Sequence, residues 1–151
     1  MSPIPRRRVF ALAAGAYILA TLPVRASTAR VAVNDNGIAI DGYDTTAYWS
    51  ISAPRHGVSS HVVNWAGSDW HFTSAEDADT FAATPEAFAP QFGGFCTRAL
   101  SFKKIINGDP EVWRIYQGKL YLFAQPIGGR KFDKGQDAMI AKAQAYWDTL
   151  N

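Results

Sequence analysis

The sequence is poor in cysteine, methionine and charged residues. It contains one cysteine, Cys96, and two methionines, and charged residues make up 19% of its 151 positions. A single cysteine cannot close a disulfide within the chain, so the thiol is free, bonded to another molecule or bound to a ligand. No Cys-x-x-Cys and no His-x-x-x-His spacing occurs, and this excludes the common patterns of structural zinc sites.

Recognisable catalytic motifs are also absent. The chain has no Gly-x-Ser-x-Gly elbow, no phosphate-binding loop and no dinucleotide fingerprint. A nucleophile pair of Cys96 and His71 is conceivable, but it requires a geometry that sequence spacing does not define. The sequence therefore favours a protein that is not an enzyme, and a thiol-dependent enzyme is the third of the three functions considered below.

Residues 1–26 have the pattern of an export signal. The basic group Arg6–Arg8 precedes an apolar run over Val9–Leu22, and Ala26 provides a small residue for cleavage. Arg7 and Arg8 with the residues after them resemble the twin-arginine export motif. The run is shorter than the ~20 residues of a membrane span, so we expect no stable span once the signal is removed. We predict a periplasmic or secreted protein with one domain over residues 27–151.

Net charge argues against nucleic acid as a partner. The formal charge of the whole chain is +2, but four arginines lie in residues 1–26, which contain no acidic residue. Residues 27–151 therefore carry a net charge of −2. Affinity for nucleic acid comes largely from Lys and Arg on phosphates, and this domain has no basic run to supply it.

Hydrophobic patterning predicts an α+β fold. Residues 61–74 and 112–123 alternate aromatic or β-branched residues around turn residues, which is typical of β-hairpins. Val31–Ile40 predicts a weak first strand, with Asn34-Asp35-Asn36-Gly37 as a turn. Residues 136–150 carry an apolar stripe at three- and four-residue steps, which indicates a C-terminal helix packed on the core. We expect a small antiparallel sheet from the two hairpins, with short helices around it and neither a repeat nor a low-complexity tract.

Short helices are predicted from their first residues. Ser74 precedes an acidic turn and can cap a helix, and Pro85 suits the first position of another. Asp44 is interpreted as a turn or cap residue before Tyr48. An alternative pairing of Asp44 with Asp41 as two catalytic carboxylates is less simple, because Gly42 between them indicates a turn.

Cys96 is the first candidate site residue. It follows Gly93-Gly94 near a predicted helix start, with Arg98 two positions on, and both features favour the thiolate that binds soft metals. Free cysteines are nevertheless among the most buried residue types and often act as small hydrophobes. Aromatic residues on both sides of the thiol favour this structural interpretation.

Histidine supplies the remaining candidate ligands. His61 and His71 would lie on adjacent strands of the first hairpin, and His56 precedes them. Together with Cys96, the residues His61 and His71 could form a Cys/His site for copper or zinc. The plainer interpretation is that these histidines are ordinary strand and loop residues, because no ligand spacing connects them.

The order of several motifs resembles the YHS-domain family, and in particular its exported, stand-alone bacterial members. The likeness extends from about Ile38 to Trp147. It is carried by Gly42-Tyr43-Asp44, Ala47-Tyr48-Trp49, Trp65-x-Gly67-x-x-Trp70-x-Phe72-x-Ser74, Phe81, Pro85, Phe88-x-Pro90-x-Phe92-Gly93-Gly94-Phe95-Cys96, Asp109-Pro110, Trp113 and Gly118-Lys119-Leu120-Tyr121-Leu122.

The resemblance implies a fold and a compartment more than a reaction. Other branches of the YHS group carry cysteines and are associated with heavy metals, including copper-transporting pumps. Where those relatives place a cysteine after the aromatic hairpin strand, this chain has Thr73, and no second cysteine follows. We therefore expect a small exported module that binds a ligand or metal near Cys96. A structural or protein-interaction domain with a buried cysteine and no metal is the alternative.

Overall fold

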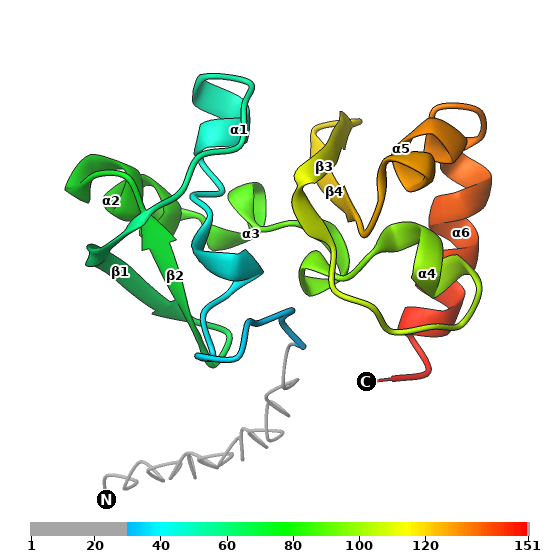
Figure 1. The fold of residues 1–151 in the computed structure, drawn as a ribbon, viewed down its shortest axis with the longest axis horizontal. Helices are drawn as coiled ribbons and strands as arrows, with labels where there is room; N and C mark the ends of the chain where they lie inside the picture. Colours follow the sequence, from blue (N-terminus) through cyan, green and yellow to red (C-terminus); the bar gives the residue numbers. More distant parts are fainter. Residues whose placement is uncertain (1–29, 151) are drawn as a thin grey trace, which may run out of the picture.

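The protein, represented by a computed structural model, is described over residues 30–150, and its helices and strands form two halves side by side (Figure 1). The predicted export signal, residues 1–26, lies outside the described residues. The elements in chain order are η1 (Ile40–Gly42), α1 (Ala47–Ser50), β1 (Val58–Trp65), β2 (Ser68–Phe72), α2 (Ala75–Ala83), α3 (Pro85–Phe88), η2 (Gln91–Gly94), α4 (Thr97–Ser101), β3 (Asp109–Tyr116), β4 (Lys119–Phe123), α5 (Pro126–Phe132) and α6 (Gln136–Trp147).

Both predicted hairpins are present, and the α+β class is confirmed. Each hairpin forms its own two-stranded antiparallel sheet, β1 with β2 and β3 with β4. The turns are tight because their central residues adopt positive φ angles, 53° and 76° at Ala66-Gly67 and 48° and 70° at Gln117-Gly118. Two consecutive positive φ angles are typical of the turns whose twist matches that of paired strands.

The predicted helix starts at Ser74 and Pro85 are also confirmed. The Asp77 N–H donates to Ser74 Oγ at 3.1 Å, which caps α2, and Pro85 is the first residue of α3. The C-terminal helix α6 packs its stripe on the core cluster of the second half. Its residues in that contact are Met139, Ile140, Ala143, Tyr146 and Trp147, and Leu150 follows beyond the helix end.

The strand predicted at Val31–Ile40 is wrong. The turn predicted at residues 34–37 is present, but it reverses the chain at once, so the segment makes only an isolated bridge between Val33 and Ala39. Ile40 then adopts a positive φ of 41° and leads into η1. The segment instead connects the two halves: the Ala32 N–H donates to Gly93 O at 2.8 Å, and Ala32 O accepts from the Ile40 N–H at 2.9 Å.

The two halves repeat the same local structure, although the sequence predicted no repeat. In both hairpins a bulge interrupts the pairing at the same place, and each residue of the second hairpin lies 51 positions after its counterpart. The matching strand partners are Val58–Phe72 and Val62–His71 in the first half, and Asp109–Phe123 and Trp113–Leu122 in the second. Identical register in both hairpins indicates one supersecondary unit used twice.

The segments before the hairpins repeat as well. The Gly57 N–H donates to Gly42 O at 2.9 Å, and the Gly108 N–H donates to Gly94 O at 2.9 Å. Both glycine carbonyls follow short runs of positive φ, at residues 40–42 and 92–94. Residues 40–42 and 92–94 are offset by 52 positions, whereas Gly57 and Gly108 share the offset of 51 found in the hairpins, so the second half is one residue shorter between these two points. Side-chain identity has diverged between the halves, which is why the repeat is not evident in the sequence.

Hydrogen bonds from two tyrosines join the halves. The Tyr48 hydroxyl donates to Pro110 O, and the Tyr43 hydroxyl donates to Glu111 Oε1, both at 2.8 Å. Burial, together with the bond to Glu111, raises the pKa of Tyr43 to about 12, so the phenol remains a donor over the physiological pH range. The first core cluster also spans the halves, because it includes Leu120 and Leu122 of β4.

Candidate functional site

Cys96 lies where η2 passes into α4. The Cys96 N–H donates to Ile106 O at 2.8 Å, which ties the segment to the loop that leads into β3. Its side chain caps α4, because the Ala99 N–H donates to Sγ at 3.4 Å. The residue is 5% exposed and belongs to the second core cluster. The buried position agrees with the structural interpretation of the thiol. Cys96 also lines a neighbouring cavity, so it borders a space that a small molecule could occupy.

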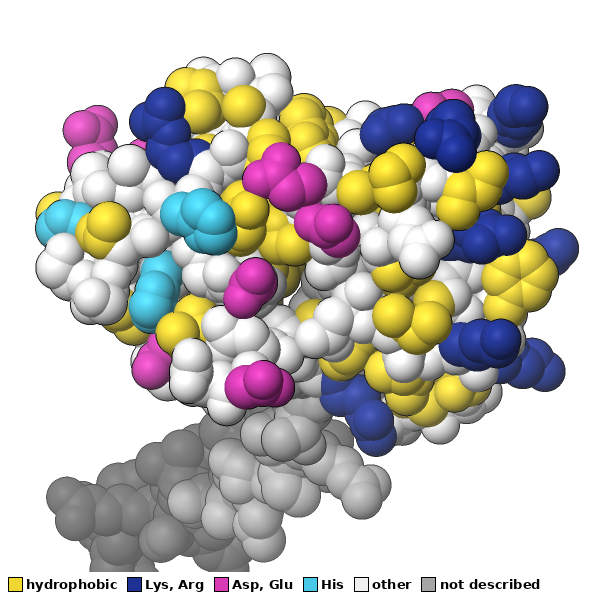
Figure 2. All heavy atoms as spheres, in the orientation of Figure 1, with side chains coloured by type: hydrophobic (Ala, Val, Ile, Leu, Met, Phe, Trp, Pro, Cys, Tyr) yellow, Lys and Arg dark blue, Asp and Glu magenta, His cyan; other side chains and the backbone are white. Residues whose placement is uncertain are grey.

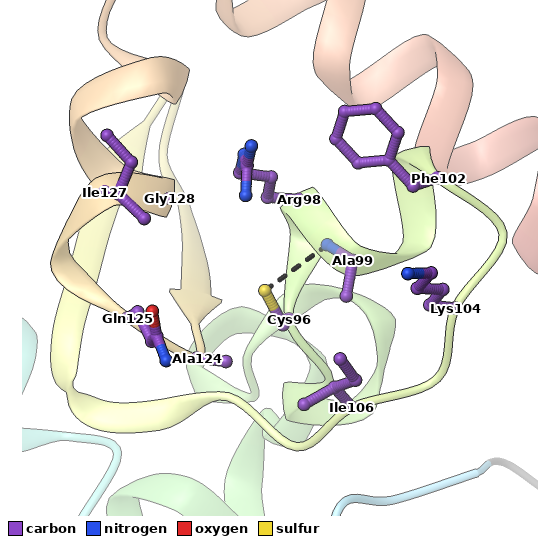
Figure 3. A pocket seen from close by; sticks show the side chains of 10 residues that line it. All are labelled: Cys96, Arg98, Ala99, Phe102, Lys104, Ile106, Ala124, Gln125, Ile127 and Gly128. Atoms are coloured by element: carbon purple, nitrogen blue, oxygen red, sulfur yellow. Dashed lines mark hydrogen bonds between the residues drawn. The ribbon is translucent and has the colours of Figure 1, made fainter.

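A cavity of about 490 Å³ lies beside the thiol, between α4 and the start of α5. Figure 3 shows Cys96 at the centre of the side chains that surround it, with the bond from Ala99 drawn as a dashed line. The wall is formed by Cys96, Arg98, Ala99, Phe102, Lys104, Ile106, Ala124, Gln125, Ile127 and Gly128. Cavities of this size and mixed apolar and polar character are typical of small-molecule sites.

Positive charge gathers around this cavity. Arg98 and Lys104 lie in its wall, and no acidic residue does. The Arg98 guanidinium also sits over the ring of Phe102, with Cζ 5.2 Å from the ring centroid. Residues 91–150 contain nine basic and five acidic side chains, whereas residues 30–90 contain two and eight. The face in Figure 2 shows this division, with most Lys and Arg side chains over the second half, which favours an anionic ligand there.

The histidines belong to the other half of the molecule. His61 is in β1 and His71 is in β2, both half-buried, and His56 precedes β1 with its ring 4.0 Å from that of Tyr43. Cys96 is in the second half, and no histidine lines the cavity beside it. Within residues 30–150, no group of three or more His, Cys, Asp and Glu side chains is placed to share a metal ion. The geometry therefore gives no support to a combined site of Cys96, His61 and His71.

Asp44 is a buried carboxylate that sequence reasoning interpreted as a turn or cap. It is 1% exposed, and its oxygens accept hydrogen bonds from the Thr46 N–H, the Thr46 hydroxyl and the Thr73 N–H at 2.8, 2.7 and 2.8 Å. Asp41 is exposed and accepts from Asn34 Nδ2 at 3.1 Å, so the two carboxylates have different partners. The Asp-x-Thr spacing predicts the bond to Thr46, but nothing local to Asp44 predicts the bond from Thr73.

Comparisons of the chain with protein-family models, with curated proteins and with solved structures give no match. The resemblance to the YHS family therefore rests on the sequence motifs described above. In the part of the chain described here, no helix has the length and apolar character needed to cross a bilayer.

Proposed function

We propose that this chain is an exported binding module of the YHS type, which holds a small ligand in the cavity beside Cys96. The single observation that carries this proposal is the cavity of about 490 Å³ beside the only cysteine, in the segment that the sequence motifs emphasise. Export to the periplasm is supported by the signal pattern of residues 1–26, and the YHS assignment is supported by the order of motifs from Ile38 to Trp147.

Binding is favoured over thiol catalysis by the composition of the cavity wall. A catalytic cysteine is commonly paired with a general base within hydrogen-bond reach, and the residues lining this cavity include neither histidine nor carboxylate. The wall instead combines the apolar side chains of Phe102, Ile106 and Ile127 with a few polar groups. This combination suits recognition of a small molecule by shape, with the polar groups setting its orientation.

A protein-interaction domain is the second candidate function. Phe102, Ile105 and Ile106 are 62%, 45% and 47% exposed, and they lie in one segment with Lys103 and Lys104 between them. Exposed apolar side chains gathered in one place are typical of contact surfaces. Substituting Ile105 with serine would separate the candidates, because Ile105 lies outside the cavity wall, so the change should weaken capture of a protein partner and leave the cavity unchanged.

Alkylation of the native protein with iodoacetamide tests the proposed function. If the cavity admits small molecules, Cys96 reacts at a rate that is independent of low urea concentrations, because no unfolding is required. A rate that rises with urea in parallel with global unfolding would show that the cavity is closed to reagents. Ile127→Trp places a larger side chain in the cavity wall, so it should narrow the cavity and slow the alkylation of Cys96. Ile115→Trp, at a similarly exposed residue outside the wall, should leave the rate unchanged.

Native mass spectrometry of protein isolated from the periplasm tests for the ligand itself. We expect a small-molecule mass on the full protein that is lost in Ile127→Trp and retained in Ile115→Trp. Replacing Arg7 and Arg8 with lysine should retain the precursor in the cytoplasm, which tests the export route separately. Detection of mature protein in the periplasm of the double variant would contradict the twin-arginine assignment.

A further inference from the structure

The repeat places Cys96 in the position that Asp44 holds in the first half. The Asp44 N–H donates to Arg55 O at 2.8 Å, and the Cys96 N–H donates to Ile106 O at 2.8 Å, so the two main chains are fixed alike. Cys96 lies 52 positions after Asp44, which is the same offset that separates Gly94 from Gly42. The first half therefore shows what this backbone arrangement does when a carboxylate occupies it.

In the first half, two main-chain N–H groups hold that carboxylate. One oxygen of Asp44 accepts from the Thr46 N–H at 2.8 Å, and the other accepts from the Thr73 N–H at 2.8 Å. The first donor precedes α1, and the second follows the last residue of β2. The two donors come from segments far apart in sequence, so the repeated fold itself builds this carboxylate site.

In the second half, the counterparts of these donors lie at the cavity. Thr46 corresponds to Arg98 and Thr73 corresponds to Ala124, and both Arg98 and Ala124 line the cavity beside Cys96. Neither of their N–H groups takes part in the main-chain hydrogen bonds outside helices and strands in residues 30–150. The hairpin register that leaves the Thr73 N–H available to Asp44 is the same at Ala124.

The cysteine side chain is too short to use these donors as aspartate does. Its sulfur carries no oxygens and accepts instead from the Ala99 N–H, three positions further along the chain, at 3.4 Å. The residues that carry the two counterpart donors thus line a cavity in the second half, whereas in the first half the donors hold a carboxylate of the protein. Arg98 and Lys104 add the positive charge that a carboxylate in this position would require.

We infer that the cavity beside Cys96 binds the carboxylate of a small organic acid, whose oxygens accept from the Arg98 and Ala124 N–H groups. This inference rests on the proposed function and adds the chemical class of the ligand. The acid carries an apolar body, because Phe102, Ile106 and Ile127 form the rest of the wall.

Titration of the full domain with butyrate and butyramide, followed by amide NMR, tests the inference. The two probes match in size and differ in charge. Butyrate is expected to move the Arg98 and Ala124 amide protons downfield, because both donate to the carboxylate, and butyramide is expected to leave them in place. Parallel titrations with sulfate and phosphate distinguish a carboxylate site from a site for inorganic oxyanions.

Two substitutions of Cys96 make the test specific. Cys96→Asp supplies the internal carboxylate that Asp44 provides in the first half, so it should fold and weaken butyrate binding at least about tenfold, the effect of losing one charge-assisted hydrogen bond. Cys96→Ser is the matched control, because serine is as short as cysteine and leaves the carboxylate position open. It should bind butyrate as the unsubstituted protein does.

Three results would overturn the inference. Equal shifts with butyramide would show a site without carboxylate preference and would leave the proposed binding function standing. Stronger shifts with sulfate or phosphate than with butyrate would show that the site prefers an inorganic anion to an organic acid. No shift with any probe, in protein whose Cys96 is alkylated readily in the native state, would refute carboxylate binding while the cavity remains accessible. If Cys96→Asp does not fold, the comparison of butyrate with butyramide on the unsubstituted protein still decides.

Discussion

Replacing Asp44 with alanine should be among the most destabilising substitutions in this domain. The carboxylate is 1% exposed and accepts three hydrogen bonds, two of them from main-chain N–H groups. It connects the segment before α1 to the end of β2, so its loss affects two elements at once. Alanine offers no acceptor to either N–H, and the buried position gives water little access to them.

The magnitude follows from the groups left without partners. A buried donor that loses its acceptor costs about 1–3 kcal/mol, and Asp44→Ala leaves the N–H groups of Thr46 and Thr73 in this state. Removing the desolvation cost of the carboxylate offsets part of this, so we expect a loss of about 3–5 kcal/mol. Asp44→Asn keeps an acceptor for Thr46 but turns an NH₂ toward the Thr73 N–H, and should cost about 1–3 kcal/mol.

Urea denaturation of both variants measures these free energies of unfolding. The expected order of midpoints is unsubstituted protein, then Asp44→Asn, then Asp44→Ala, with unchanged slopes. Asp41→Asn is the matched control for Asp44→Asn, because Asp41 is an exposed carboxylate that accepts one hydrogen bond from Asn34 Nδ2 at 3.1 Å, and asparagine tolerates its positive φ of 55°, so the change should cost less than about 0.5 kcal/mol. If Asp44→Asn lost no more stability than Asp41→Asn, the carboxylate would not hold the two segments together, and the template for the ligand site would fail as well.

Three further predictions concern other parts of the chain. Gly93→Ala should cost about 2–4 kcal/mol in urea denaturation, because φ is +62° and a Cβ would lie 1.8 Å from Arg30 O; near-native stability would contradict this packing. Asp133→Asn removes the 2.8 Å ion pair with Arg114 and should cost less than about 1 kcal/mol at pH 7. The hydrogen bond to Arg114 lowers the pKa of Asp133, so this contribution is present above the ordinary value of 3.8 and disappears as the pH falls through the lowered pKa; a difference that persisted in acid would refute it. Copper and zinc contents of protein isolated from the periplasm should be equal in the unsubstituted protein and in Cys96→Ser, and a loss of metal in the variant would make Cys96 a ligand.

Sequence patterns predicted the elements whose causes are local. Ala66-Gly67 and Gln117-Gly118 define the two hairpin turns, and Ser74 marks the start of α2, because each signal acts within a few residues. The strand expected before η1 was wrong for the opposite reason. The local turn at residues 34–37 was predicted correctly, but the contacts of Ala32 with both halves, which determine the conformation of the rest of the segment, are not local.

The candidate site was only partly predictable. Its centre, Cys96 beside a glycine pair, was evident from the sequence, and so was the nearby Arg98. The combination with His61 and His71 was proposed because those residues are potential ligands, yet the histidines belong to the first hairpin and Cys96 to the second half. Spacing along the chain gives no information about which half a residue joins when the same unit occurs twice.

What the sequence by itself determined is the set of turns, helix starts and apolar stripes, because these depend on neighbours in the chain. Only the tertiary structure decided that the two hairpin units repeat in identical register and that Asp44 and Cys96 are counterparts. The cavity, too, depends on contacts between α4, the loop through Ile106 and the chain after β4, which are brought together by folding. Equivalent main-chain N–H groups hold a carboxylate of the protein in the first half, and the residues that carry them line the cavity in the second. This correspondence is evident only when the two halves are compared in space.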